Sequence, residues 1–470
     1  MGQSTEQLTE QLTGRQNRIQ CTIQKSLQAA LFCAAILCSL GQANPTLAGS
    51  QTKSIKASKN ALATINIRGL SASEVDSLKN NKTFKWWSEF GDTLVVGADQ
   101  SVIETSTTTF EHVWKSLSEN NLRVIVAGHK NELPAATTVI AHSGRATLVI
   151  NNSALEAMAS EPKDDLTQEH LSIRKFLTNT TYIQSSDHRK NPLTWSVQQS
   201  TWAQAAMQSI DSARWYSDVQ KLSGWNRHIS AAGVVSARDW LKGQFESLHP
   251  TTTVLQKFTA RGRDAWNVIA TFDAGPNADI YIVGGHYDSI SEQVSTSAPG
   301  AEDNASGAAG VLELARVFAG QKNHATLIFI GFSGEEEGLL GSYAYVASAT
   351  KEFKARIKSV MTMDMIGYSK DATTDVLLET ASEFSALTAQ YAAAASQVEG
   401  LTSFTSFNPW GSDHMPFIEK HIPAMLTIDN DWGVYPPYHK TGDTIDQISR
   451  EMGTAILKMN AAVLAVMAGS

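Results

Sequence analysis

Short apolar runs alternate with helical patterns through the second half of the chain. The apolar runs, which are rich in β-branched and aromatic residues, lie at 265–272, 279–285, 325–332, 359–367 and 423–429. Between them, 307–320 and 382–397 carry apolar side chains at helical spacing. Near-continuous apolar strands separated by helices predict an α/β fold: a mixed, largely parallel sheet with helices on both faces, in three layers.

The pattern of the first part of the chain is different and predicts a second, smaller domain. Strand-like alternation at 61–70 and 93–98 is accompanied by helical patterns at 71–80 and 110–121. We therefore expect a small α+β N-terminal domain, either an accessory domain or a propeptide, over 44–150. The polar, weakly periodic stretch that follows predicts a linker over 151–194, and the larger domain occupies 195–470.

The first 43 residues have the features of a secretory signal peptide. Basic residues precede an apolar run at 27–40, and Gly41-Gln42-Ala43 then places small residues, Gly41 and Ala43, at the −3 and −1 positions of a possible cleavage site. The run is shorter than the roughly 20 residues that span a bilayer, so no stable membrane span is expected. The sequence thus predicts a secreted or periplasmic protein.

Composition narrows the chemistry available to the mature chain. The 470 residues carry a net charge of −8, which argues against general nucleic-acid binding. All three cysteines, at positions 21, 33 and 38, fall within the predicted signal peptide. Any metal site in the rest of the chain must therefore use His, Asp and Glu.

Imidazole and carboxylate side chains follow the predicted strands of the larger domain. In chain order they are His286, Asp288, Glu335, Glu336, Asp364 and His439. Asp303 lies in a loop between the first two groups and opens the helix at 307–320. Because ligands bind at the carboxyl ends of parallel strands, we expect these side chains to meet there. A set of His and carboxylates without thiols suits Zn²⁺ or a similar divalent ion.

Most of these residues have an ordinary explanation when each is taken alone. A histidine after a strand is usually a turn residue, and an aspartate in such a loop is often a helix N-cap. Asp364 is harder to explain in this way, because a carboxylate inside the apolar run 359–367 would be buried. A buried carboxylate needs a cation or full hydrogen bonding. The combination therefore indicates a metal site.

Five motifs that carry these residues resemble one known family. In chain order they are GGHYDS, PGAEDNASG, GFSGEEEGLLGS, MTMDMIGY and YHKTGDT. In this order they resemble the secreted co-catalytic dizinc aminopeptidases of the bacterial leucyl aminopeptidase family, over about 195–470. The resemblance implies the zinc-peptidase type of three-layer fold and two Zn²⁺ ions per chain.

The resemblance also implies a metal-binding role for five residues. Asp303 resembles the carboxylate that bridges the two zinc ions. His286 and Asp364 resemble the remaining ligands of one ion, and Glu336 and His439 resemble those of the other. The family has a cis peptide bond after its bridging aspartate, so one is expected after Asp303.

Neighbouring carboxylates have different roles by the same resemblance. Glu335 resembles the general base, which takes a proton from the attacking water and passes it to the leaving amine, and so must not bind metal. Asp288 resembles the carboxylate that orients His286. Glu337, the third of the run, has no role in this scheme and is expected to be solvated.

The function that the resemblance implies is an exported zinc aminopeptidase. Such an enzyme removes the N-terminal residue from peptides with a free N-terminus, and we expect it to act as a monomer. Metallo-carboxypeptidases or deacylases and single-zinc glutaminyl cyclases have similar metal cages, so they remain alternatives. A non-catalytic binding protein that kept the fold and lost its metals is a further alternative.

Two expectations concern the surroundings of the site. Some secreted relatives carry a cysteine pair where this chain has FNPWG at 407–411, so the side-chain pocket is expected to differ. The N-terminal domain is expected to be an inhibitory prodomain or a folding helper, removed by processing between about 191 and 201. Candidate pocket walls are Met365, Phe407, Trp410, Ile428, Trp432, Tyr435 and Tyr438.

Overall fold

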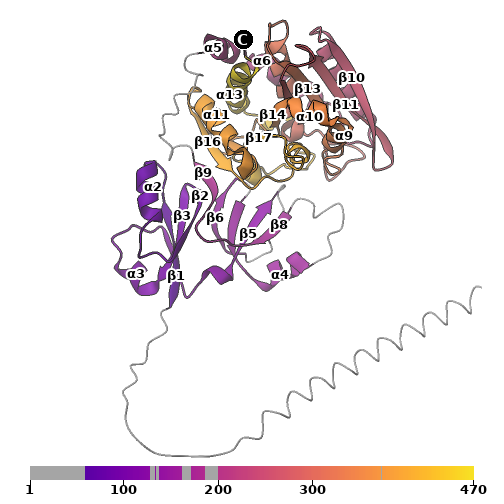
Figure 1. Cartoon of the computed structure of the whole chain (residues 1–470). Helices are drawn as coiled ribbons and strands as arrows, with labels where there is room; N and C mark the ends of the chain where they lie inside the picture. The colour runs from indigo at the N-terminus through magenta and orange to yellow at the C-terminus, as the bar shows by residue number, and fades with distance from the viewer. Residues whose placement is uncertain are drawn as a thin grey trace, which may run out of the picture. The chain divides into compact units, whose positions relative to one another are not determined.

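The computed structural model describes residues 59–127, 133, 137–144, 146–160, 171–185, 200–371 and 373–469. The chain from Ser58 to Ser470 forms one compact unit (Figure 1). The predicted signal peptide at 1–43 and most of the predicted processing region at 191–201 lie outside the described residues.

The second half of the chain contributes one continuous stretch of a mixed sheet. Its strand order is β10-β11-β13-β12-β14-β17-β15-β16. The four central strands β13, β12, β14 and β17 run parallel, whereas β10, β11 and β15 add antiparallel pairings. Their bounds are β10 Thr252–Ala260, β11 Arg263–Phe272, β12 Ile280–His286, β13 Thr326–Phe332, β14 Ile357–Met363, β15 Thr374–Glu379, β16 Leu401–Ser406 and β17 Ala424–Asp429.

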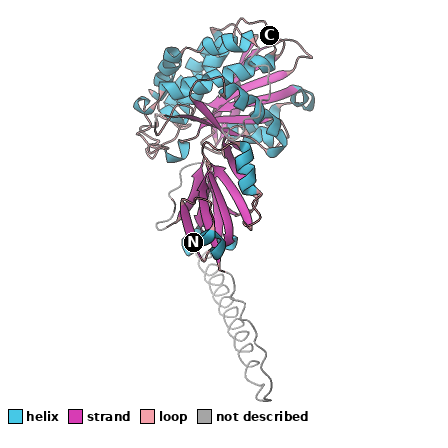
Figure 2. Ribbon diagram, turned by 90° about the vertical axis from the view of Figure 1, so that its left-hand side faces the viewer, coloured by secondary structure: helices cyan, strands magenta, loops and turns pink. Residues whose placement is uncertain are grey.

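Helices cover both faces of this sheet, as the apolar runs predict. Every residue of β13 is buried. Leu327 and Phe329 pack into the core on one face, whereas Ile328 and Ile330 pack into the core on the other. The three-layer α/β prediction is therefore confirmed, and Figure 2 shows helices around these strands. The first face carries α5 (Thr201–Gln208), α6 (Ser212–Ser223), α7 (Ala232–Glu246), α8 (Gly307–Phe318), α11 (Ser385–Ala395) and α13 (Arg450–Ala468), and the second carries α9 (Leu340–Ser348), α10 (Lys351–Arg356) and α12 (Met415–Ile418).

Strands dominate the described residues before α5. One set extends the large sheet in the order β9-β2-β3-β1-β4, and a separate sheet has the order β6-β7-β5-β8. Strand β9 pairs antiparallel with β16, so the large sheet is continuous between the two parts of the chain. The bounds are β1 Asn60–Asn66, α2 Ala72–Lys79, β2 Trp86–Gly91, β3 Thr93–Asp99, α3 Gln100–Thr105, β4 His112–Lys115, β5 Leu122–Ala127, β6 Val139–Ser143, β7 Ala146–Ile150, α4 Ser153–Ser160, β8 Leu171–Lys175 and β9 Thr180–Ser185.

The structure differs from two predictions for this region. The helix predicted at 110–121 contains the strand β4, which pairs with β1 and has partly or fully exposed side chains. The stretch predicted as a linker at 151–194 contains α4, β8 and β9. Strands β4 and β8 are edge strands of their sheets, where main-chain pairing on one side holds them without an apolar pattern. Strand β9 lies inside the large sheet and pairs with both β16 and β2, partners that no local pattern reveals.

The long helix α13 lies in the core of the second half. It begins after Ser449, whose hydroxyl accepts a hydrogen bond from the Met452 amide. Of the described helices, α13 alone is long and apolar enough to cross a membrane, but 72% of its most apolar window is buried inside the protein. This burial is what a core helix requires.

Trp215 joins α6, α13 and the turn that carries Asp303. Its side chain is fully buried, and its indole Nε1 donates a hydrogen bond to the Ser306 carbonyl at 3.0 Å. Gly453 of α13 faces the ring so closely that a Cβ there would lie 2.0 Å from it. The absence of a side chain at position 453 therefore lets α13 and α6 approach each other.

We expect Gly453→Ala to destabilise the protein by about 1–3 kcal/mol, because the added methyl overlaps the Trp215 ring. Gly243→Ala is the matched control, since no heavy atom lies within 4 Å of a Cβ built there on α7. The control should gain about 0.5–1 kcal/mol from lower backbone entropy in the unfolded chain. Urea unfolding of both variants measures the difference; a Gly453→Ala variant as stable as the wild type would contradict this packing.

Candidate metal centre

The carboxyl ends of the central parallel strands bring the candidate residues together. His286 is the last residue of β12, and Asp364 directly follows its neighbour β14. Glu335 and Glu336 follow β13, the neighbour of β12 on the other side. Since parallel strands end at the same edge, these side chains are delivered to one place.

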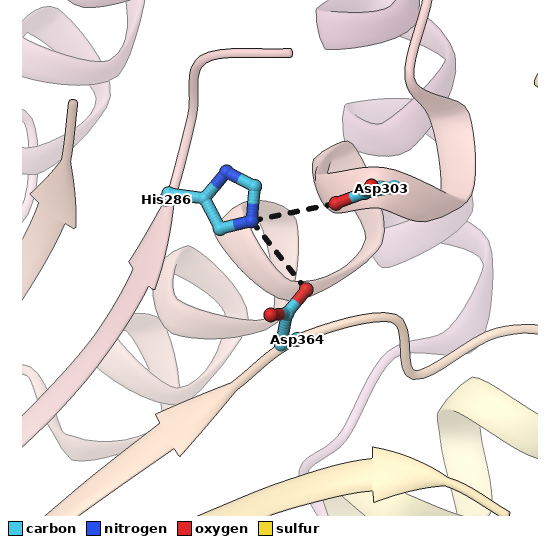
Figure 3. A group of neighbouring side chains, drawn as sticks. All are labelled: His286, Asp303 and Asp364. Atoms are coloured by element: carbon cyan, nitrogen blue, oxygen red, sulfur yellow. Dashed lines mark ion pairs between the residues drawn. The ribbon is translucent and has the colours of Figure 1, made fainter. Parts of the chain in front are cut away.

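The first group consists of His286, Asp303 and Asp364 (Figure 3). His286 Nε2 lies 3.4 Å from Asp303 Oδ1 and 3.4 Å from Asp364 Oδ1. All three residues are buried. Figure 3 shows the imidazole pointing between the two carboxylates, an arrangement in which one ion can be held by one nitrogen and two oxygens.

The second group consists of Asp303, Glu336 and His439. His439 Nε2 lies 3.0 Å from Asp303 Oδ2 and 3.0 Å from Glu336 Oε2. Asp303 thus belongs to both groups: Oδ1 faces His286, and Oδ2 faces His439. All five residues that the resemblance marks as ligands are therefore in the two groups.

The electrostatics of the groups reflect this sharing. Burial by itself would raise the pKa of Asp303, but its contacts with His286 and His439 lower it. Burial would lower the pKa of His439, yet the carboxylates of Glu336 and Asp303 raise it to about 10. Burial and the Asp303 charge raise the pKa of Glu336 to about 7. Without a cation, protons on these groups must balance the carboxylate charge.

Several of these atoms form no hydrogen bond to any described residue. They are His286 Nε2, Asp364 Oδ1 and Glu336 Oε1, all inaccessible to solvent. Buried polar atoms are nearly always hydrogen-bonded, so such a cluster requires an explanation. Divalent cations supply one, because each unsatisfied nitrogen or oxygen would become a ligand.

Glu335 lies beside both groups without belonging to either. It is buried, and neither of its carboxylate oxygens forms a hydrogen bond to a described residue. Its Oε2 is 3.9 Å from His286 Nε2, farther than the carboxylates of Asp303 and Asp364. Burial raises the pKa of Glu335 well above its usual range.

Asp288 contacts the glutamate turn more than it contacts the histidine. Its carboxylate oxygens accept hydrogen bonds from the amides of Glu335 and Glu336, each at 3.4 Å. Its Oδ1 lies 3.7 Å from His286 Nδ1, whose nearer contact is the Asp288 carbonyl at 3.3 Å. Asp288 therefore holds the turn after β13 close to the end of β12, and its carboxylate faces the imidazole from a greater distance than a hydrogen bond.

Two supporting residues were not predicted. Asp443 accepts hydrogen bonds from the amides of Glu302 and Asp303, at 2.8 and 3.0 Å, and so fixes the turn at the shared carboxylate. Ser412 donates a hydrogen bond to Asp364 Oδ2 at 2.7 Å. Asp443 lies inside the motif YHKTGDT, four residues after His439. Its place in that motif could have marked it as a candidate for a role at the site. The peptide bond after Asp303 is cis, as the resemblance implies.

Glu337 is not solvated as predicted. Its carboxylate lies 3.2 Å from His228 Nε2 and 3.3 Å from Arg261 Nε, and its side chain is mostly buried. The hydrogen bond with His228 lowers the pKa of Glu337. The prediction failed because both partners come from distant loops, which no local pattern reveals.

Most of the predicted pocket walls are buried in a cluster with residues of the first part of the chain. Met365, Ile428, Trp432, Tyr435 and Tyr438 are nearly inaccessible to solvent, whereas Phe407 and Trp410 are half-buried. The partners from the first part include Trp86, Phe90, Leu122, Val124, Ile140, Phe176, Tyr182 and Ile183.

Comparison with known proteins shows what this part of the chain is similar to. Residues 267–466, which contain every candidate ligand, match the family model described as Peptidase family M28. The match confirms the resemblance drawn from the motifs. The match is to this segment, which is less than half of the chain.

Individual relatives share this segment. The chain is 35% identical over 189 residues to a probable zinc metalloprotease of Pyricularia oryzae, covering 35% of this chain and 38% of the relative. It is 34% identical over 179 residues to aminopeptidase YwaD of Bacillus subtilis, covering 37% of this chain and 38% of that one. The chain thus spans about two fifths of the length of these curated relatives.

A solved structure shares the fold over a longer stretch. The LapA aminopeptidase of Legionella pneumophila is 19% identical, with a TM-score of 0.53. The match covers 74% of this chain and 98% of that chain. At this level of identity the likeness concerns the fold.

Proposed function

We propose that this chain is a zinc-dependent aminopeptidase that uses two Zn²⁺ ions. One observation carries the proposal: the two carboxylate oxygens of Asp303 face two separate histidine–carboxylate groups, while Glu335 stays outside both. The match to peptidase family M28 and the relatives described as a zinc metalloprotease and an aminopeptidase support it.

The donor set fits zinc. Each group offers one imidazole nitrogen and two carboxylate oxygens, and a further position remains for a non-protein ligand, as in catalytic zinc sites. His286 and Asp364 would hold one ion, Glu336 and His439 the other, and Asp303 both. When bound there, zinc would supply Lewis-acid activation of the scissile carbonyl and of the attacking water.

Glu335 is the proposed general base. Its carboxylate is next to the first group, and its oxygens are not engaged by hydrogen bonds from described residues. Burial raises its pKa, which favours holding a proton between the attack and the departure of the amine. Asp288 holds the main chain of Glu335 and Glu336 through their amides, so that one glutamate can act as the base while its neighbour binds metal.

The proposed substrates are peptides with a free N-terminus, and the proposed product is the released first residue. We propose that the chain acts as a monomer that is exported by the predicted signal peptide to the periplasm or beyond. A deacylase, a metallo-carboxypeptidase or a single-zinc glutaminyl cyclase on the same fold would differ in how the pocket recognises the amine or carboxylate end of the substrate. Assays with an amino-acid p-nitroanilide and an N-blocked peptide distinguish them.

We further propose that the first part of the chain covers the side-chain pocket of the active site. Five candidate wall residues are buried in a cluster with strands β2, β5, β6 and β9. The turn between β6 and β7 also lies against the loop before His439, since a Cβ built at Gly433 would be 3.6 Å from the Gly144 carbonyl. A substrate side chain would have to replace these contacts.

We expect Glu335→Gln to bind zinc like the wild type and to lose turnover by about 10²–10⁴-fold, because proton transfer is removed while the ligands stay. Glu337→Gln is the matched control: it changes the same chemical group two residues away, where Glu337 pairs with His228 and Arg261. The control should keep most of its activity. Zinc content by atomic absorption and kcat on leucine p-nitroanilide are the two measurements.

Two outcomes would contradict the proposal. A wild-type protein that binds no zinc, or that is unaffected by chelators, would exclude the metal mechanism. A Glu335→Gln variant with near-normal turnover would exclude Glu335 as the base.

Release of the first part of the chain should raise activity. A protease recognition site inserted within 191–199 allows the folded chain to be cut, and the two fragments can then be separated by size exclusion under mild urea. We expect kcat/KM to rise once the N-terminal fragment has left, because the wall residues become accessible. The uncut chain carrying the same insertion is the control, and equal activity of the intact and separated forms would contradict inhibition.

A further inference from the structure

Arg227 is a buried arginine whose guanidinium, among the described residues, donates hydrogen bonds only to main-chain carbonyls. It lies between α6 and α7, and its side chain is inaccessible to solvent. Its Nε donates to the Tyr287 carbonyl at 2.7 Å, and Nη2 donates to the Gly300 carbonyl at 2.8 Å. Its Nη1 donates to the carbonyls of Leu222 and Pro299, at 2.9 and 2.5 Å.

Three of these four carbonyls, all but that of Leu222 in α6, belong to the segments that carry His286 and Asp303 of the first metal-binding group. Tyr287 lies between His286 and Asp288 at the end of β12. Gly300 directly precedes the turn Ala301–Ser306 and lies three residues before Asp303. The Arg227 main chain also joins them, since its amide donates to the Ala298 carbonyl and its carbonyl accepts from the Ser289 amide, both at 3.4 Å. One residue thus ties the end of β12 to the start of the Asp303 turn.

Arginine suits this position for a chemical reason. Its planar fork offers five N–H donors in a fixed geometry, so it can hold several carbonyls at set directions. Among the described residues it forms no ion pair, but the carboxylates of Asp443, Asp288, Asp303 and Glu336 favour its charged form. Burial lowers the pKa of Arg227 to about 10, so it is a cation at neutral pH.

We propose that Arg227 is a positioning residue of the metal centre, which sets the separation of His286 and Asp303 and thereby the affinity of the first group for zinc. The inference rests on the proposed function, because it assigns Arg227 to that same site. Lysine in its place would keep the charge, but it would lose the fork that spans the two segments.

The test compares zinc affinity in three variants by titrating metal-free protein against a competing chelator dye. Arg227→Lys should remain folded and bind at least one zinc roughly tenfold more weakly than the wild type. Its kcat should fall by a larger factor than its KM changes. Arg227→Met should bind still more weakly, with Arg227→Lys intermediate. Circular dichroism and melting temperature are recorded for each protein.

Arg356→Met is the matched control. Arg356 also donates to main-chain carbonyls, those of Ala278 and Gly275 at 2.9 Å each, but these lie just before β12, at the opposite end from His286. It should lower the melting temperature without changing zinc affinity. This control separates loss of general stability from loss of positioning.

The outcomes are distinguishable. Zinc affinity of Arg227→Lys equal to that of the wild type would overturn the role of Arg227 and leave the proposed function intact. A loss of affinity in Arg356→Met as large as in Arg227→Lys would also overturn it, because the effect would then be general. A wild-type chain that takes up no zinc would instead overturn the proposed function.

Discussion

The two carboxylate oxygens of Asp303 face two different imidazoles, and the rest of the centre is arranged around this shared group. Its Oδ1 lies near His286 and its Oδ2 near His439, which come from chain segments about 150 residues apart. Each oxygen belongs to a separate group that includes a further carboxylate; the first group is buried throughout, whereas His439 of the second is partly exposed. So many buried carboxylates beside unsatisfied nitrogen and oxygen atoms are stable only with compensating positive charge.

Strand ends and a hydrogen-bonded turn, rather than long loops, hold this arrangement in place. The strands β12 and β14 end side by side, so His286 and Asp364 need no long connections to meet. The Asp303 turn is fixed at its amides by Asp443 and packed from behind by Trp215. Ligands that lie on a strand or directly after it are held more rigidly than ligands on long loops, and metal binding requires such precise geometry.

The amino-acid sequence predicts the centre better than its surroundings. His286 and the glutamates follow apolar runs that are long enough to be buried strands, and Asp364 lies within another such run. Both the fold and the meeting point therefore follow from one pattern. The strands β8 and β9 escaped prediction because their stability comes from pairing with other strands, which has no local signature. Glu337 and Arg227 escaped for the same reason: their partners are distant side chains and main-chain carbonyls.

X-ray diffraction at the zinc absorption edge tests the central claim most directly. Crystals of the protein loaded with zinc should show two anomalous peaks about 3.5–4 Å apart, with the carboxylate of Asp303 between them. The first peak should lie beside His286 and Asp364, and the second beside Glu336 and His439. A single peak, or two peaks that do not share Asp303, would contradict the account.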